Sequence, residues 1–331
     1  MLVKPHQQLW YEFLVSLAII LGVLFCILPL EGFVFKWWKD HAMLLSLIYL
    51  GAGVLFFVFS SIRLTMVSFA ACAALCLFLN ERMQSPLANP KPTADPVFKI
   101  IQFKLEDNAQ DDLLSVLQIE ADLISVQGVP QSQVGQVNDL FTCCGYPYFH
   151  CTIDSSSRRA ITVYSKHPFR DIKSLYYPDA PGIAGVVRFS EEDAQEDFHF
   201  FTSFFETIDN PEIYARAQGS LKTFAHQLKR VEQPLFVFGH YGLVPWSSEI
   251  QFLKQHSELA DSRRFLKPSF PHGYISVFNQ PLDHILYSNH FKCISFETIS
   301  SSTNPHIGIV GAFQFKNQAV VNYVEAKYQE F

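Results

Sequence analysis

Charged side chains are scarce in this 331-residue chain. Asp, Glu, Lys and Arg together make up 17% of the residues, whereas soluble globular proteins average about a quarter. Hydrophobic residues make up 49%, which excludes a disordered chain, because so much apolar surface cannot remain solvated. The formal net charge is −6, so the chain lacks the basic balance typical of nucleic-acid binders, and we do not expect nucleic acid as a partner.

Two familiar chemical patterns are also absent. No pair of cysteines has Cys-x-x-Cys spacing, so a structural zinc site is not indicated. Neither Ser165 nor Ser247 lies in a Gly-x-Ser-x-Gly context, and serine hydrolase chemistry therefore has no support. Cys143 and Cys144 could form a disulfide with Cys151 outside the cytoplasm, and the alternative is that these cysteines are free, buried thiols.

Long apolar runs are concentrated at the N-terminal end. Residues 13–30 and 43–62 contain no charge, and residues 64–79 follow after Arg63 alone. A helix that crosses a bilayer needs about 20 apolar residues, so residues 1–83 are predicted to be a membrane anchor with about three transmembrane helices. We expect the second and third helices to form a hairpin.

The first run could instead be a cleaved signal peptide. Two further apolar runs follow it, and Lys4 is the only basic residue before it, so a membrane helix is favoured. Aromatic residues flank the runs, as they do at membrane surfaces: Trp10, Tyr11, Trp37 and Trp38.

The remainder of the chain has a different pattern. Four prolines in residues 84–96 predict a semi-extended linker, because proline at this density interrupts helices and strands. Residues 97–331 interleave strand and helix patterns, which indicates an α/β layered fold. The predicted strands are 97–103, 123–126, 160–164, 185–189, 198–205, 235–238, 283–288, 293–297 and 308–315. The predicted helices are 111–120, 211–230 and 248–257.

Several segments, in order, resemble motifs of the endonuclease/exonuclease/phosphatase superfamily. They are residues 121–129, 164–169, 238–247 and 281–288, with Asn304-Pro305-His306 where the family has Ser-Asp-His. The resemblance implies that residues 97–331 form a four-layer α-β-β-α sandwich, in which two packed mixed sheets are flanked by helices. It also implies an ancestral activity, the hydrolysis of phosphate esters with a divalent metal, usually magnesium.

The family's metal-binding positions have changed here. By this resemblance Lys104 replaces an Asn on the first strand, Gly128 replaces a Glu, and Pro305 replaces an Asp. Carboxylates are the ligands that a Mg²⁺ site can least do without. We therefore expect no metal at these positions and no cofactor, with Mg²⁺ or Mn²⁺ as the family's alternative.

Other catalytic positions have changed as well, and two remain. The family's water-orienting Asp corresponds to His240, its Asn to Gly242, and a substrate-contacting His to Phe204. The retained pair is Asp283 and His306. Zinc bound by His240, Asp283 and His306 is a further alternative, since two imidazoles and a carboxylate suit that ion.

These changes predict a pseudoenzyme that binds a phosphate-containing ligand or a protein partner. Lys104, Gly242 and His284 are the candidate ligand-binding residues. The alternative is an active phosphoesterase or phosphodiesterase of altered chemistry that uses Asp283 and His306, with His240 beside them.

The resemblance to membrane-anchored bacterial members predicts a multi-pass protein of the bacterial inner membrane with its C-terminal domain outside the cytoplasm. The charges that flank the apolar runs favour the opposite orientation, because Lys36, Lys39, Arg82 and Lys91 would lie on the domain side. We follow the resemblance. The acidic run 191–197 is expected to be a solvated loop, with a calcium or basic-partner site as the alternative.

Overall fold

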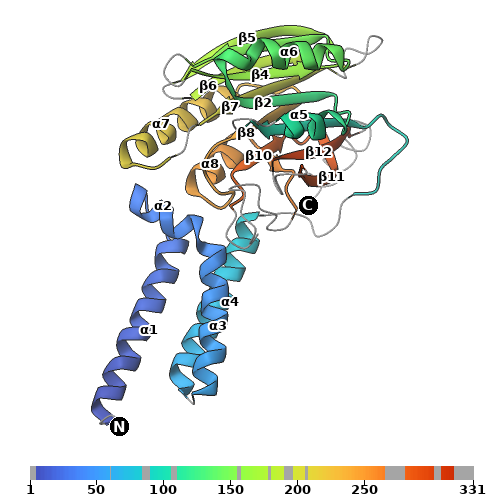
Figure 1. Cartoon of the computed structure of the whole chain (residues 1–331). Coiled ribbons are helices and arrows are strands. Elements are labelled where there is room, and N and C mark those ends of the chain that lie inside the picture. The colour runs from blue at the N-terminus through green and yellow to red at the C-terminus, as the bar shows by residue number, and fades with distance from the viewer. Residues whose placement is uncertain are drawn as a thin grey trace.

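A bundle of helices stands below an α/β domain (Figure 1). The computed structural model describes residues 5–59, 61–83, 90–105, 110–154, 158–177, 180–189, 197–205, 208–264, 280–301 and 307–316. The predicted linker lies partly outside these residues, and its described part, residues 90–96, contains neither helix nor strand.

The bundle contains four helices, α1 (Pro5–Ile27), α2 (Phe33–Asp40), α3 (Ala42–Val58) and α4 (Ile62–Met83). Both α1 and α4 are long and apolar enough to cross a membrane, and the pair α2 and α3, bent by 58°, could form a third span. The expected count of about three is thus roughly confirmed. The helix bounds differ from the apolar runs, because α4 continues past the predicted end at residue 79 through Asn80, Glu81 and Arg82 to Met83.

Two mixed six-stranded sheets make up the domain. The first has the order β11-β12-β1-β2-β4-β3 and the second the order β5-β6-β7-β8-β10-β9. In each sheet one central pair is parallel, β1 with β2 and β7 with β8, and the other neighbours are antiparallel.

The strands of the first sheet are β1 (Phe98–Lys104), β2 (Leu123–Pro130), β3 (Tyr148–Ile153), β4 (Arg159–Ser165), β11 (Phe291–Ile299) and β12 (Gly308–Phe315). Those of the second are β5 (Phe169–Tyr177), β6 (Ala180–Val187), β7 (Phe198–Phe204), β8 (Leu235–His240), β9 (Ala260–Asp261) and β10 (Asp283–Tyr287).

Helices cover the outer face of each sheet. On the first sheet α5 (Gln110–Leu117) and α6 (Val134–Cys143) bury apolar side chains against β1, β2 and β4. On the second, α7 (Pro211–Leu228) and α8 (Ser248–His256) pack against β8 and β10. The four-layer α-β-β-α sandwich is therefore confirmed.

Phenylalanine fills the space between the sheets. Phe98 of the first sheet stacks on Phe198 of the second with ring centroids 5.2 Å apart, and Phe236 and Phe291 approach to 4.2 Å. Aromatic pairs of this kind contribute about 0.5–1.5 kcal/mol beyond the burial of their area. Nine buried phenylalanines belong to the apolar cluster between the sheets and supply much of the apolar surface that joins the two layers.

Every predicted strand and helix of the domain is present. The sequence analysis missed α2 of the bundle and, among the described residues of the domain, α6, β3, β5, β9 and a short 3-10 helix at Gln131–Gln133. The cysteine expectation also needs correction. All seven cysteines are free, and Cys143 and Cys144 are exposed around the end of α6 instead of buried. The acidic run lies outside the described residues except for Asp197, which pairs with Arg170 at 3.1 Å.

The domain packs directly on the helical bundle. Trp246, from the segment between β8 and α8, donates its indole N–H to the Lys39 carbonyl oxygen at 2.6 Å. Gln251 of α8 donates to the Arg82 carbonyl oxygen at 2.9 Å. Trp246 also joins a buried apolar cluster with Leu75 and Phe78 of α4, so hydrogen bonds and packing together hold the two parts.

We predict that Trp246→Ala lowers the melting temperature of the full-length protein in detergent. Truncation of a buried Trp removes packing and typically costs about 3–5 kcal/mol. Trp10→Ala is the matched control, since Trp10 is 58% exposed at the other end of the bundle. Equal melting temperatures for the two variants would contradict this docking.

Candidate functional site

Three of the sequence-predicted positions meet at the ends of neighbouring strands. Phe204 at the end of β7 is in register with His240 at the end of β8, and His240 is in register with Asp283 at the start of β10. His240 Nδ1 lies 3.0 Å from Asp283 Oδ1, and both side chains are buried. Strand pairing therefore brings an imidazole and a carboxylate together without water between them.

Gln127 of β2 connects this pair to the other sheet. Its Oε1 accepts a hydrogen bond from the His240 backbone N–H at 2.9 Å, and its Nε2 donates to the Ser203 carbonyl oxygen and to Thr202 Oγ1, both at 3.0 Å. The side chain is fully buried. A buried amide with its donor and acceptor satisfied fixes the relative position of the strands that it joins.

Lys104 approaches the same place from the end of β1, where it pairs with Gln127 in the ladder. Its Nζ lies 5.9 Å from the centroid of the Phe204 ring, within the range of a cation–π interaction. The Phe204 and His240 rings are 6.1 Å apart. We call Lys104, Gln127, Phe204, His240 and Asp283 the strand-end cluster.

Arg263 contacts the backbone of the strand-end cluster at Asp283, and the sequence analysis missed this residue. It is 1% exposed, donates from Nη2 to the Asp283 carbonyl oxygen at 2.6 Å, and lies 5.1 Å from the Phe296 ring. Burial lowers the pKa of Arg263, and the charges of Asp261 and Asp283 oppose that shift. The pair Arg263-Arg264 in a chain so poor in charge was the available signal.

His284 and Gly242 do not join the strand-end cluster. His284 is fully buried and donates from Nε2 to the Leu243 carbonyl oxygen, with these atoms 2.8 Å apart. Gly242 has a φ of 62°, in the left-handed region that glycine adopts easily. Both residues shape the segment after β8, and their role in ligand binding stays a prediction.

The residues present do not fit the family's metal. Lys104 brings an ammonium group to the first-strand position, and Gly128 has no side chain to donate an oxygen. Gly128 lies in a bulge between β2 and β4 with a φ of 78°, and a Cβ there would lie 3.2 Å from the Leu105 carbonyl oxygen. A Glu at this position would be strained.

Within the described part of the chain, no three His, Cys, Asp or Glu side chains gather in a group that could hold a metal ion. Pro305 and His306 lie outside the described residues, so the structure does not place the third residue of the zinc alternative. The expectation that no metal binds thus stays a prediction.

We predict that the stability of the protein falls as the pH drops from 6.5 toward 4, in part through His284. Burial lowers the pKa of His284 from 6.5 to about 4, so in this range the unfolded chain binds a proton that the folded chain excludes. The loss from this residue between pH 7.5 and pH 5 should be about 2 kcal/mol.

His284→Gln should reduce the pH dependence of the unfolding free energy, measured with denaturant in detergent at both pH values. His226→Gln, on the exposed face of α7, is the control and should keep the wild-type dependence. The same dependence in both variants would show that His284 does not carry this titration.

No family model and no curated protein sequence matches this chain. Solved structures do match. An endonuclease/exonuclease/phosphatase from Beutenbergia cavernae aligns with a TM-score of 0.54 at 13% identity, covering 67% of this chain and 72% of that one. The human Nocturnin catalytic domain aligns with a TM-score of 0.56 at 15% identity, covering 71% and 99%.

A family protein from Bacteroides thetaiotaomicron aligns with a TM-score of 0.54 at 14% identity, covering 68% of this chain and all of that one. Identities this low show the fold alone. The fold of this chain is that of the endonuclease/exonuclease/phosphatase superfamily, as the motifs at residues 121–129 and 281–288 predicted.

Proposed function

We propose that this chain is a membrane-anchored protein that has lost metal-dependent hydrolysis and binds a phosphate-containing ligand at the strand-end cluster. The observation that carries the proposal is the position of Lys104. Its ammonium reaches the Phe204 ring, beside the His240–Asp283 pair, from the strand end where the family binds its metal.

The proposed loss of metal-dependent hydrolysis rests on the residues at the family's metal-ligand positions. A Mg²⁺ ion requires several oxygen ligands, and two of the family's positions are now Lys104 and Gly128. The Asp283 carboxylate is engaged by His240, and its backbone is held by Arg263. A lysine supplies positive charge but cannot lower the pKa of a bound water as a metal does.

Phosphate binding is supported by the lysine at position 104. A lysine binds phosphate as a point charge, and the Lys104 side chain is only partly buried at this strand end. Asp283 is paired with His240, which reduces the repulsion that a lone carboxylate would exert on an anion.

We predict that Mg²⁺ and Mn²⁺ leave the melting temperature of the full-length protein unchanged, and that it hydrolyses neither bis-p-nitrophenyl phosphate nor p-nitrophenyl phosphate. Inorganic phosphate should raise the melting temperature, because a ligand stabilises the state that binds it. Lys104→Gln should weaken this effect about tenfold in apparent affinity.

Arg63→Gln, a loss of charge at the end of α4 that points away from the domain, is the matched control and should keep the wild-type response to phosphate. Turnover that His306→Ala abolishes and His226→Ala preserves would overturn the proposal in favour of an active phosphoesterase of altered chemistry. Stabilisation by Zn²⁺ alone would favour a site made of His240, Asp283 and His306.

We also propose that the protein resides in a bacterial inner membrane with its domain outside the cytoplasm. Support comes from the two or three helices that could span a membrane and from the resemblance to membrane-anchored bacterial proteins. The excess of basic residues on the domain side opposes this orientation.

Fusions to the C-terminus in a bacterial host test the orientation. Alkaline phosphatase, which is active only outside the cytoplasm, should be active, and green fluorescent protein should be dark. Fusions after Ser61, between α3 and α4, should give the reverse pattern. Bright fluorescence at the C-terminus would place the domain in the cytoplasm.

A further inference from the structure

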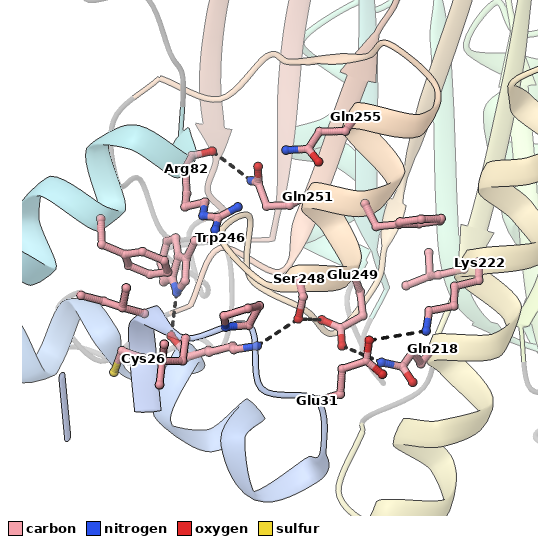
Figure 2. A pocket seen from close by; sticks show the side chains of 17 residues that line it. Cys26, Glu31, Arg82, Gln218, Lys222, Trp246, Ser248, Glu249, Gln251 and Gln255 are labelled. Atoms are coloured by element: carbon pink, nitrogen blue, oxygen red, sulfur yellow. Dashed lines mark hydrogen bonds and ion pairs between the residues drawn. The ribbon is translucent and has the colours of Figure 1, made fainter. Parts of the chain in front are cut away.

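A cavity of about 250 Å³ lies where the helical bundle meets the domain (Figure 2). Its walls come from the ends of α1 and α4, from the segment between α1 and α2, and from α7 and α8 of the domain. One water needs only about 10–15 Å³, so there is room for a larger polar group. The strand-end cluster does not line this cavity.

Charged side chains line one part of the cavity. Lys39 donates to Ser248 Oγ at 2.9 Å, Lys222 approaches Glu31 at 3.7 Å, and Glu249 accepts a hydrogen bond from Gln218 (Figure 2). Glu249 also accepts a hydrogen bond from Tyr214. With Arg82, the lining has three basic and two acidic side chains. The formal charge of the lining is therefore one positive unit.

Arg82 and Lys39 are the lining cations that form no ion pair with a carboxylate among the described residues, whereas Lys222 approaches Glu31. The Arg82 guanidinium lies 5.8 Å from the centroid of the Phe78 ring. The Arg82 carbonyl oxygen is held by Gln251, which fixes the end of α4 beside the cavity. The N-terminus of α8 also reaches the cavity at Ser248, and a helix N-terminus favours anions.

Apolar side chains form the remaining wall. Ile27, Leu28 and Phe78 line it on the side of the bundle, and Leu221, Trp246 and Phe252 line it on the side of the domain. A free inorganic anion would gain nothing from contact with these apolar side chains. A molecule with a charged group and an apolar remainder matches both parts of the lining.

The cavity lies at the domain-side ends of α1 and α4, the two helices that are long and apolar enough to cross a membrane. It adjoins the domain-side end of α1, below which Leu17, Leu21 and Leu24 are at least 40% exposed, as expected of side chains that face lipid. Trp37, 54% exposed on the short helix α2, is of the residue type enriched at membrane surfaces. Lipid phosphates occupy this level of a bilayer.

We propose that this cavity binds the phosphodiester group of a membrane phospholipid. Arg82, Lys39 and the N-terminus of α8 bind the phosphate, and Phe78 and Trp246 contact the apolar part of the lipid that follows it. A phosphodiester carries one negative charge, which balances the single positive charge of the lining. The bound lipid joins the bundle to the domain.

The test uses the full-length protein in a neutral detergent, and the measurement is the rise in melting temperature as lipid is added. The probes are dioleoyl phosphatidylglycerol, dioleoyl phosphatidylethanolamine, dioleoylglycerol and inorganic phosphate. We expect both phospholipids to stabilise the protein and dioleoylglycerol, which has no phosphate, to have no effect. Arg82→Gln should weaken phospholipid binding at least tenfold.

Arg63→Gln is the matched control, because Arg63 is an exposed arginine at the opposite end of α4. It should keep the wild-type response, and Arg82→Lys should retain part of it. Equal stabilisation by dioleoylglycerol would overturn the proposal in favour of non-specific apolar contact. Inorganic phosphate that stabilises the protein to the same extent, and through Arg82, would overturn the assignment to a lipid.

Discussion

The buried amide of Gln127 holds together the part of the molecule on which the candidate site depends. It lies on the first sheet, yet its acceptor and donor are satisfied by the second, at His240 and Ser203. Because a buried polar group without a partner is strongly unfavourable, the two sheets keep one relative position at this edge. Phenylalanine packing brings the layers together, and Gln127 determines which strand ends meet.

Under the proposed function, the charge at that edge is opposite to the charge of the family's site. The family's site is built from carboxylates around a cation, whereas here an ammonium, an imidazole and a paired carboxylate lie in the same region. The backbone has followed the side chains, since Gly128 adopts a conformation that a Glu would find strained.

Much of the fold could be predicted because its central strands, such as residues 98–104 and 235–240, are short apolar runs that stand out in the sequence. The missed strands β3 and β5 lie at the edges of their sheets and expose much of their surface. The missed helix α2 has only eight residues. Motif order identified Asp283 and His240 as neighbours. The junction cavity was not predictable, because its lining comes from segments far apart in the sequence.

Trp246 and Gln251 contact the bundle directly, so the helical bundle also orients the domain. A domain joined only by a flexible linker would sample many orientations relative to the helices. Here the contacts with the bundle hold the domain in one orientation. Transmembrane helices tilt when the bilayer thickness changes, and here a tilt of α4 would turn the sandwich with it. Because these contacts join α4 to the domain, the orientation of the domain is tied to the orientation of that helix.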